Sequence, residues 1–195
     1  MEQQKYHIRD YHFWKISLSL AFASFFVFAS IYVVQPLLPL FVREFNVSVS
    51  EATLTLSMTI VGLIIGLIIL GFFSDRIGRV AIIKYSLIGS VIPFLLIPLL
   101  DSFYLFVLLR FIQGFALAGL PAASLAYLNE EINRSSVGIA TALYIASNAL
   151  GGMVGRVVAG YLTDAYSWDS HLVPLQRFSP HSAYIRDYQL DHHYN

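Results

Sequence analysis

Cysteine is absent from the 195-residue chain, so disulfides, thiolate metal sites and cysteine nucleophiles are all excluded. Charge is also scarce, because Asp, Glu, Lys and Arg together make up 12% of the residues while hydrophobic residues make up 57%. Soluble domains carry about 25% charged residues. The composition therefore excludes an ordinary soluble domain and predicts a protein whose partner is the lipid bilayer. The zero net charge gives no reason to expect a nucleic-acid partner.

Long apolar runs predict five membrane-spanning helices, over about residues 16–42, 52–74, 82–100, 103–128 and 137–163. A polar segment over residues 1–15 precedes them, and a polar, irregular tail over residues 169–195 follows them. The first run is too long for a signal-peptide core and lacks a small-residue cleavage site, so we expect the chain to retain it. The pattern predicts an all-α, multi-pass membrane protein.

Acidic residues are missing from all five runs. A carboxylate within a membrane span is a common carrier of a coupling proton. The sequence therefore offers no such carrier in this part of the chain.

A short stretch between the second and third runs combines glycine with charge, at Gly71, Asp75, Arg76, Gly78 and Arg79. We expect it to form a ten-residue loop, in which the glycines permit a tight turn and an acid and a base lie near helix ends. A plain topology-setting turn is the alternative. The spacing Gly-x-x-x-Asp-Arg-x-Gly-Arg resembles the signature loop between the second and third helices of the major facilitator superfamily of membrane transporters. Val80 departs from that pattern, because the family usually has a basic residue there.

The fourth run contains Arg110, Gln113 and Gly114, which resemble the family's second motif, Arg-x-x-Gln-Gly. An arginine within a span costs roughly 2.5–3.5 kcal/mol on insertion scales and is normally turned toward protein or water. Arg110 therefore either lines the substrate path or extends to the membrane interface.

Two further stretches resemble motifs of efflux-type members of the family. In the first run, Gln35 precedes Pro36 near the position where many antiporters carry an Asp, and glutamine cannot bind a coupling proton. The fifth run carries Asn148, Gly151, Gly155 and Arg156 in place of the glycine-rich motif of antiporters, without its Gly-Pro pair.

The glycines and the arginine of the fifth run can each be interpreted in two ways, and for the glycines the alternative to an antiporter motif is helix packing. Gly151 and Gly155 have the small-xxx-small spacing of a helix-packing surface. Arg156 could join Arg110 in a cationic lining for an anionic or polar substrate, or it could anchor the outer end of its helix.

Glu130, Glu131 and Arg134 close the fourth run on the same side as Asp75 and Arg79. The resemblance implies an inner gate built from such acid and base pairs. A solvated loop face is the alternative.

The tail carries four of the six histidines, at His171, His181, His192 and His193. Their spacing matches no ligand signature, so we expect no metal and no cofactor. About 20 apolar residues should follow Trp168 if a sixth helix were present. We therefore expect the reading frame to be interrupted near Trp168, and the second half of the transporter to be missing.

The resemblance implies five helices of the N-terminal six-helix bundle of a secondary transporter in the cell inner membrane. Its function would be proton-linked efflux of a small solute or drug of unknown identity, with no enzymatic activity, and this chain would be inactive alone. Two alternatives are a nonfunctional or structural membrane fragment and a small membrane-anchored protein with a histidine-rich tail.

Basic residues predict the orientation in the membrane. Seven lie on the side of the N-terminus, at Lys5, Arg9, Lys15, Arg76, Arg79, Lys84 and Arg134, against Arg43 alone on the opposite side before the tail. By the positive-inside rule, the N-terminus and the Asp75 stretch should be cytoplasmic. A phosphatase fused at Ile77 should therefore be inactive, because the enzyme requires export. Phosphatase activity there would overturn both the orientation and the resemblance.

Overall fold

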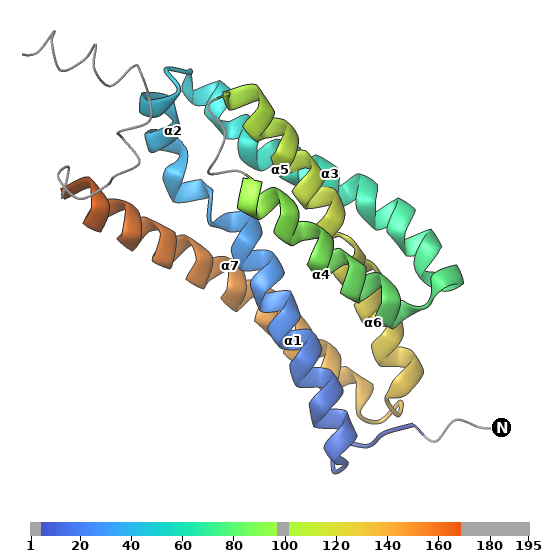
Figure 1. The fold of residues 1–195 in the computed structure, drawn as a ribbon. Coiled ribbons are helices and arrows are strands. Elements are labelled where there is room, and N and C mark those ends of the chain that lie inside the picture. Colours follow the sequence, from blue (N-terminus) through green and yellow to red (C-terminus); the bar gives the residue numbers. More distant parts are fainter. Residues whose placement is uncertain (1–4, 97–101, 169–195) are drawn as a thin grey trace, which may run out of the picture.

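The computed structural model describes residues 5–96 and 102–168, and every regular element within them is helical (Figure 1). The elements are α1 (Tyr11–Tyr32), the short 3-10 helix η1 (Gln35–Leu37), α2 (Leu38–Glu44), α3 (Val49–Ile77), α4 (Arg79–Leu96), α5 (Phe103–Leu117), α6 (Gly119–Glu131) and α7 (Val137–Trp168). In this part of the chain, five helical stretches are long and apolar enough to span a membrane: Tyr11–Glu44, Val49–Ile77, Arg79–Leu96, Phe103–Glu131 and Val137–Ala165. The prediction of an all-α membrane protein with five spans is confirmed.

The first span is broken where the sequence places its prolines. Helix α1 ends at Tyr32, and the chain passes through η1 before α2 resumes the span. Proline has no backbone N–H, so Pro36 cannot donate to the carbonyl of Tyr32 and cannot continue the helix. The carbonyl oxygens in the last turn of α1 are left for other donors.

The predicted ten-residue loop around Asp75 is wrong. Helix α3 continues through Asp75 and Arg76 to Ile77, and α4 begins at Arg79, so Gly78 is the whole connection. Gly78 has φ +105°, a conformation that residues with a side chain rarely adopt. Polarity indicated a loop, but a helix can extend out of the apolar layer until a glycine ends it.

The fourth span contains a break that the sequence analysis missed. Helix α5 ends at Leu117 and α6 begins at Gly119, with the backbone N–H of Ala118 bonded to the carbonyl of Phe115 at 3.3 Å. Pro121 explains the break, because it has no backbone N–H to donate to the carbonyl of Leu117 and fits best in the first turn of a helix.

Other predicted features fall at or beyond the edge of the described residues. Helix α4 passes through Pro93 near its end, and the predicted tail over residues 169–195 lies outside the described residues.

The helices pack mainly in two groups. Helix α7 lies along α1, while α3 and α4 lie along the α5 and α6 pair (Figure 1). Glycines make the closest approaches possible, as expected between membrane helices. A Cβ atom at Gly114 of α5 would overlap the backbone oxygen of Thr59 in α3, and one at Gly155 of α7 would lie 2.7 Å from that of Ala29 in α1.

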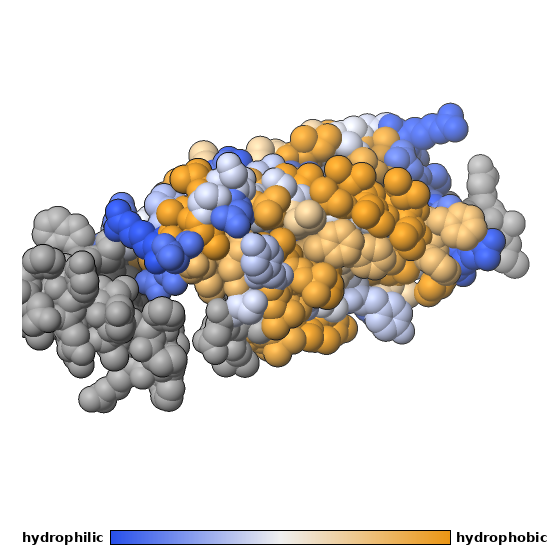
Figure 2. All heavy atoms as spheres, turned by 90° about the horizontal axis from the view of Figure 1, so that it is seen from above, coloured by the Kyte–Doolittle hydropathy of each residue, from blue (hydrophilic) through white to orange (hydrophobic). Residues whose placement is uncertain are grey.

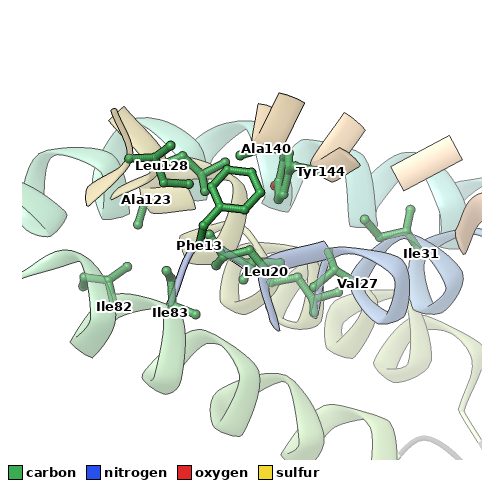
Figure 3. Close-up of a cluster of buried hydrophobic side chains, with 13 residues drawn as sticks. Phe13, Leu20, Val27, Ile31, Ile82, Ile83, Ala123, Leu128, Ala140 and Tyr144 are labelled. Atoms are coloured by element: carbon green, nitrogen blue, oxygen red, sulfur yellow. The ribbon is translucent and has the colours of Figure 1, made fainter. Parts of the chain in front are cut away.

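An apolar cluster joins the groups near the starts of α1 and α7. Figure 3 shows Phe13 of α1 beside Leu128 of α6 and Ala140 of α7, and all three are completely buried. The outer surface is also largely hydrophobic. On the face in Figure 2, apolar side chains cover most of the middle and the most hydrophilic ones lie mainly toward the two ends, as a bilayer requires.

We call the end that carries the start of α1, the Gly78 turn and the α6 to α7 connection the motif end. The opposite end, with α2 and the starts of α3 and α5, is the far end.

The glycine contacts generate a stability prediction. Replacing Gly114 by leucine forces α3 and α5 apart and should destabilise the protein by about 1–3 kcal/mol or more, the usual cost of overpacking. Gly138→Leu is the matched control, because a Cβ atom at this exposed position of α7 meets nothing within 4 Å. Thermal unfolding in detergent measures both variants. Equal melting temperatures for the two would contradict the close packing of α3 and α5.

Candidate gate and substrate-path residues

Arg79 forms an ion cluster that connects three helices at the motif end. Its Nη2 atom lies 3.1 Å from Oε1 of Glu130 in α6, its Nε atom donates to the same oxygen at 3.1 Å, and its Nη1 atom pairs with Asp75 in α3. Nη1 also donates to the Oγ atom of Ser74 at 3.3 Å. The carboxylates are well exposed, and exposed ion pairs contribute only about 0–1 kcal/mol each. The cluster therefore orients the helix ends and can open at little cost.

Neighbouring charged residues do not join the cluster. Of the two adjacent acids in α6, Glu130 pairs with Arg79, and the side chain of Glu131 makes no ion pair in the described part of the chain. One step along a helix turns a side chain by about 100°, so only one of two adjacent acids can face Arg79. Arg134 is exposed and outside the cluster, and the guanidinium of Arg76 lies 4.4 Å from the ring centre of Phe72. A Cβ atom added at Gly71 would meet only the Cβ atom of Ala122 within 4 Å, at 4.0 Å, so no close helix approach requires this glycine.

The N-terminal segment is part of the motif end, which the sequence analysis did not predict. The backbone N–H of Tyr6 donates to the carbonyl of Glu131 at 2.9 Å, and that of Asn133 donates to the carbonyl of Tyr6 at 3.0 Å. Lys5 Nζ donates to the carbonyl of Asn129 at 2.8 Å. This segment therefore holds the connection beside Glu130 in place. The signal in the sequence was the alternation of the apolar Tyr6 and Ile8 within polar surroundings, since both pack against the core cluster.

Arg110 is buried at the break in the first span, with 2% of its surface exposed. Its Nη2 atom donates to the carbonyl oxygens of Ile31 at 3.3 Å and Ser30 at 3.5 Å, and its Nη1 atom donates to Oε1 of Gln113 at 2.6 Å. A cation is favoured at the negative C-terminal end of a helix, where carbonyls lack helical donors. Arg110 thus caps α1 from α5 and does not extend to the interface.

Gln113 and Gly114, the other residues of this motif, support that position. Gln113 is 1% exposed and accepts from Arg110, while Gly114 lets α5 approach α3.

Arg156 reaches the same break from α7. Its Nε atom donates to Oε1 of Gln35 at 2.6 Å, and its guanidinium lies 4.1 Å from the ring centre of Tyr32. Unlike Arg110, it is exposed. The structure therefore brings both predicted cations to the end of α1, but with different surroundings.

The remaining predicted residues of the fifth span face α1. Asn148 Oδ1 accepts a hydrogen bond from the Oγ atom of the buried Ser24. Gly151 and Gly155 contact the backbone of Phe25 and Ala29. These contacts support the helix-packing interpretation of both glycines.

The described residues contain no group of three or more His, Cys, Asp or Glu side chains that could hold a metal ion. Both ion pairs in this part of the chain involve Arg79 at the motif end. The break in the first span thus concentrates two arginines without an ion-paired carboxylate, which suits contact with a polar or anionic group.

Comparison with known proteins agrees with this arrangement. The family model of the Major Facilitator Superfamily matches residues 20–172, well over half of the chain. The chain belongs to this superfamily of transporters, which agrees with the expectation that it is not an enzyme.

Several relatives are transporters by name. The chain is 41% identical over 156 residues to the uncharacterized MFS-type transporter YybF of Bacillus subtilis, covering 80% of this chain and 39% of the relative. It is 35% identical over 171 residues to the inner membrane transport protein YnfM of Escherichia coli, covering 88% of this chain and 41% of the relative. The multidrug resistance protein MdtG of Citrobacter koseri is 28% identical over 159 residues, covering 78% of this chain and 39% of the relative. The chain thus spans about two fifths of the length of these relatives.

The capping role of Arg110 generates a prediction. In Arg110→Leu, the carbonyls of Ser30 and Ile31 lose their charged donor, and an unsatisfied buried acceptor costs about 1–3 kcal/mol. The melting temperature in detergent should fall by several degrees, and Arg110→Lys should restore part of the loss. Arg134→Leu, at an exposed position, is the control and should leave the melting temperature unchanged. A melting temperature of Arg110→Leu at or above that of the unaltered protein would refute the capping role.

Proposed function

We propose that this chain forms part of one of two moving helical bundles of a secondary transporter that exports a small solute or drug. The observation that carries the proposal is the Arg79 cluster, which connects α3, α4 and α6 through Asp75 and Glu130. Alternating access requires contacts at one end of the membrane that form in one state and break in the other. Partly exposed ion pairs that contribute about 1 kcal/mol or less have the strength that such a contact needs.

The proposal places the protein in the cell inner membrane with the motif end in the cytoplasm. The excess of basic residues at that end supports this orientation. The name of the relative YnfM, an inner membrane transport protein, supports the location. In this orientation, the Arg79 cluster belongs to the inner gate.

Export is supported by the first-span motif around Gln35 and by the relative MdtG, which is named for multidrug resistance. Coupling to protons is also part of the proposal. Gln35 cannot titrate, and no carboxylate lies in the interior of the five predicted spans. The group that binds the coupling proton should therefore belong to the second bundle, which this chain would need as its partner.

The geometry argues that the chain is inactive alone. A substrate path between two bundles needs surfaces on both sides, and the described residues supply five spans. This reasoning also covers the alternative of a structural membrane fragment, which would share the fold and lack activity even when completed. The histidine-rich tail of the third alternative lies outside the described residues.

A chimaera tests the proposal. Residues 1–168 replace the matching part of YnfM, and the product is reconstituted in liposomes with an imposed proton gradient and a panel of sugars, amino acids, carboxylates and cationic dyes. We expect gradient-dependent flux of at least one solute from the chimaera and none from the 195-residue chain alone. Asp75→Asn and Glu130→Gln should each reduce the flux by up to about fivefold, because each removes one exposed ion pair that contributes about 1 kcal/mol or less.

Glu131→Gln is the matched control, because this adjacent acid does not pair with Arg79, and it should retain the flux. Equal flux in the Glu130 and Glu131 variants would show that the cluster has no role in the transport cycle and only helps to set the orientation in the membrane. A chimaera that inserts correctly but transports none of the solutes would favour the structural fragment.

A further inference from the structure

Arg156 and Arg110 differ in which of their nitrogen atoms already donate to the protein and which can still bind a ligand. Both terminal nitrogens of Arg110 donate to protein oxygens, and its side chain is buried. Arg156 donates to protein through Nε alone, and its side chain is exposed. The two Nη atoms of Arg156 are therefore the cationic hydrogen-bond donors that this region can offer to another molecule.

Arg156 lies at a depth in its span where a charged side chain normally has a counterion. It lies nine residues before the end of the stretch Val137–Ala165, or about 14 Å along the helix at 1.5 Å per residue. Charges at such depth normally pair with other protein groups or mark a ligand pathway. In the described part of the chain, Arg156 pairs with no carboxylate.

The surroundings of Arg156 hold its guanidinium in one orientation. Gln35 binds Nε at 2.6 Å, and the ring of Tyr32 stacks at 4.1 Å from the guanidinium carbon. Gly152 makes room for that ring, because a Cβ atom there would lie 3.0 Å from Cδ2 of Tyr32. The side chain is thus directed toward the break in α1, and an arginine that only anchored the helix end would need neither contact.

We propose that Arg156, Gln35 and Tyr32 form a subsite for the carboxylate group of a small organic anion that the transporter carries. A guanidinium with Nε occupied presents its Nη atoms as a planar pair, which matches the two oxygens of a carboxylate. The Tyr32 ring offers an apolar surface next to that pair. This inference rests on the proposed transport function and names its substrate class.

Benzoate is a suitable probe, because it combines a carboxylate with an apolar ring. Its binding to the purified 195-residue chain in maltoside detergent is measured by saturation-transfer NMR, with benzylamine and benzyl alcohol as the cationic and neutral analogues. We expect benzoate to bind more tightly than both analogues. Arg156→Gln should weaken benzoate at least about tenfold, because it removes a charge-assisted bidentate pair. Arg156→Lys should also weaken it, because lysine keeps the charge and lacks the planar fork.

Two controls separate the subsite from general charge and from folding. Arg43→Gln removes another exposed cation at the far end and should leave benzoate binding unchanged. The folding control is the melting temperature, which should be the same for all variants and the unaltered chain. Gln35→Leu is a second, milder variant. It removes only the contact to Nε of Arg156 and should weaken benzoate binding severalfold.

Three results would overturn the subsite. They are the absence of benzoate binding up to about 20 mM, where even a millimolar site would be filled, equal binding by Arg156→Gln, and equal binding of benzylamine. Displacement of benzoate by added phosphatidylglycerol at equimolar concentration would assign the site to lipid phosphate and would overturn the solute assignment.

The chimaera keeps this inference distinct from the proposed function. Flux of neutral or cationic solutes that Arg156→Gln leaves intact, with no flux of carboxylates, would remove the subsite and retain the transporter. Benzoate binding without flux of any solute would retain the carboxylate-binding site and remove the transport function.

Discussion

The break in the first span creates the constraint on which the surrounding structure depends. Within a bilayer, every backbone carbonyl needs a donor from the protein, and Pro36 removes one from the end of α1. Arg110 of α5 donates to two neighbouring carbonyls in the same last turn, those of Ser30 and Ile31. The cost of burying one cation is thus offset by the carbonyls that it satisfies at the negative end of a helix. The end of α1 at this break therefore provides the acceptors that stabilise a buried arginine in the middle of the protein.

Close helix packing fixes the positions of the side chains that meet at the break in the first span. Glycines bring α3 against α5 and α7 against α1, so the side chains that meet at the break come from three helices with little freedom to slide. The same packing directs Arg156 over Tyr32, across the space that Gly152 leaves open. Two arginines that look alike in the sequence consequently have different roles. Arg110 has both of its terminal nitrogens bonded to the protein, whereas Arg156 is exposed and donates to the protein through Nε alone.

The motif end follows a different physical rule. Its contacts are exposed ion pairs and backbone hydrogen bonds from the N-terminal segment, which are weak singly and reversible. Arg79, Asp75 and Glu130 therefore join helix ends without locking them. A tightly packed interior beside weakly tied ends is what a bundle that moves as a unit requires.

Periodic and local features of the chain were sufficient to predict the fold class, the five spans and the family. The length of each uncharged apolar run follows directly from the thickness of the bilayer, and Gly71 to Arg79 form a contiguous motif. Contacts between distant segments could not be predicted in this way. The choice of Glu130 over Glu131 depends on a rotation of about 100° about α6, the bond from Tyr6 to Glu131 joins residues far apart in the chain, and the capping by Arg110 depends on where α5 crosses α1. Tertiary packing decided these contacts, because it alone determines which face of each helix meets another.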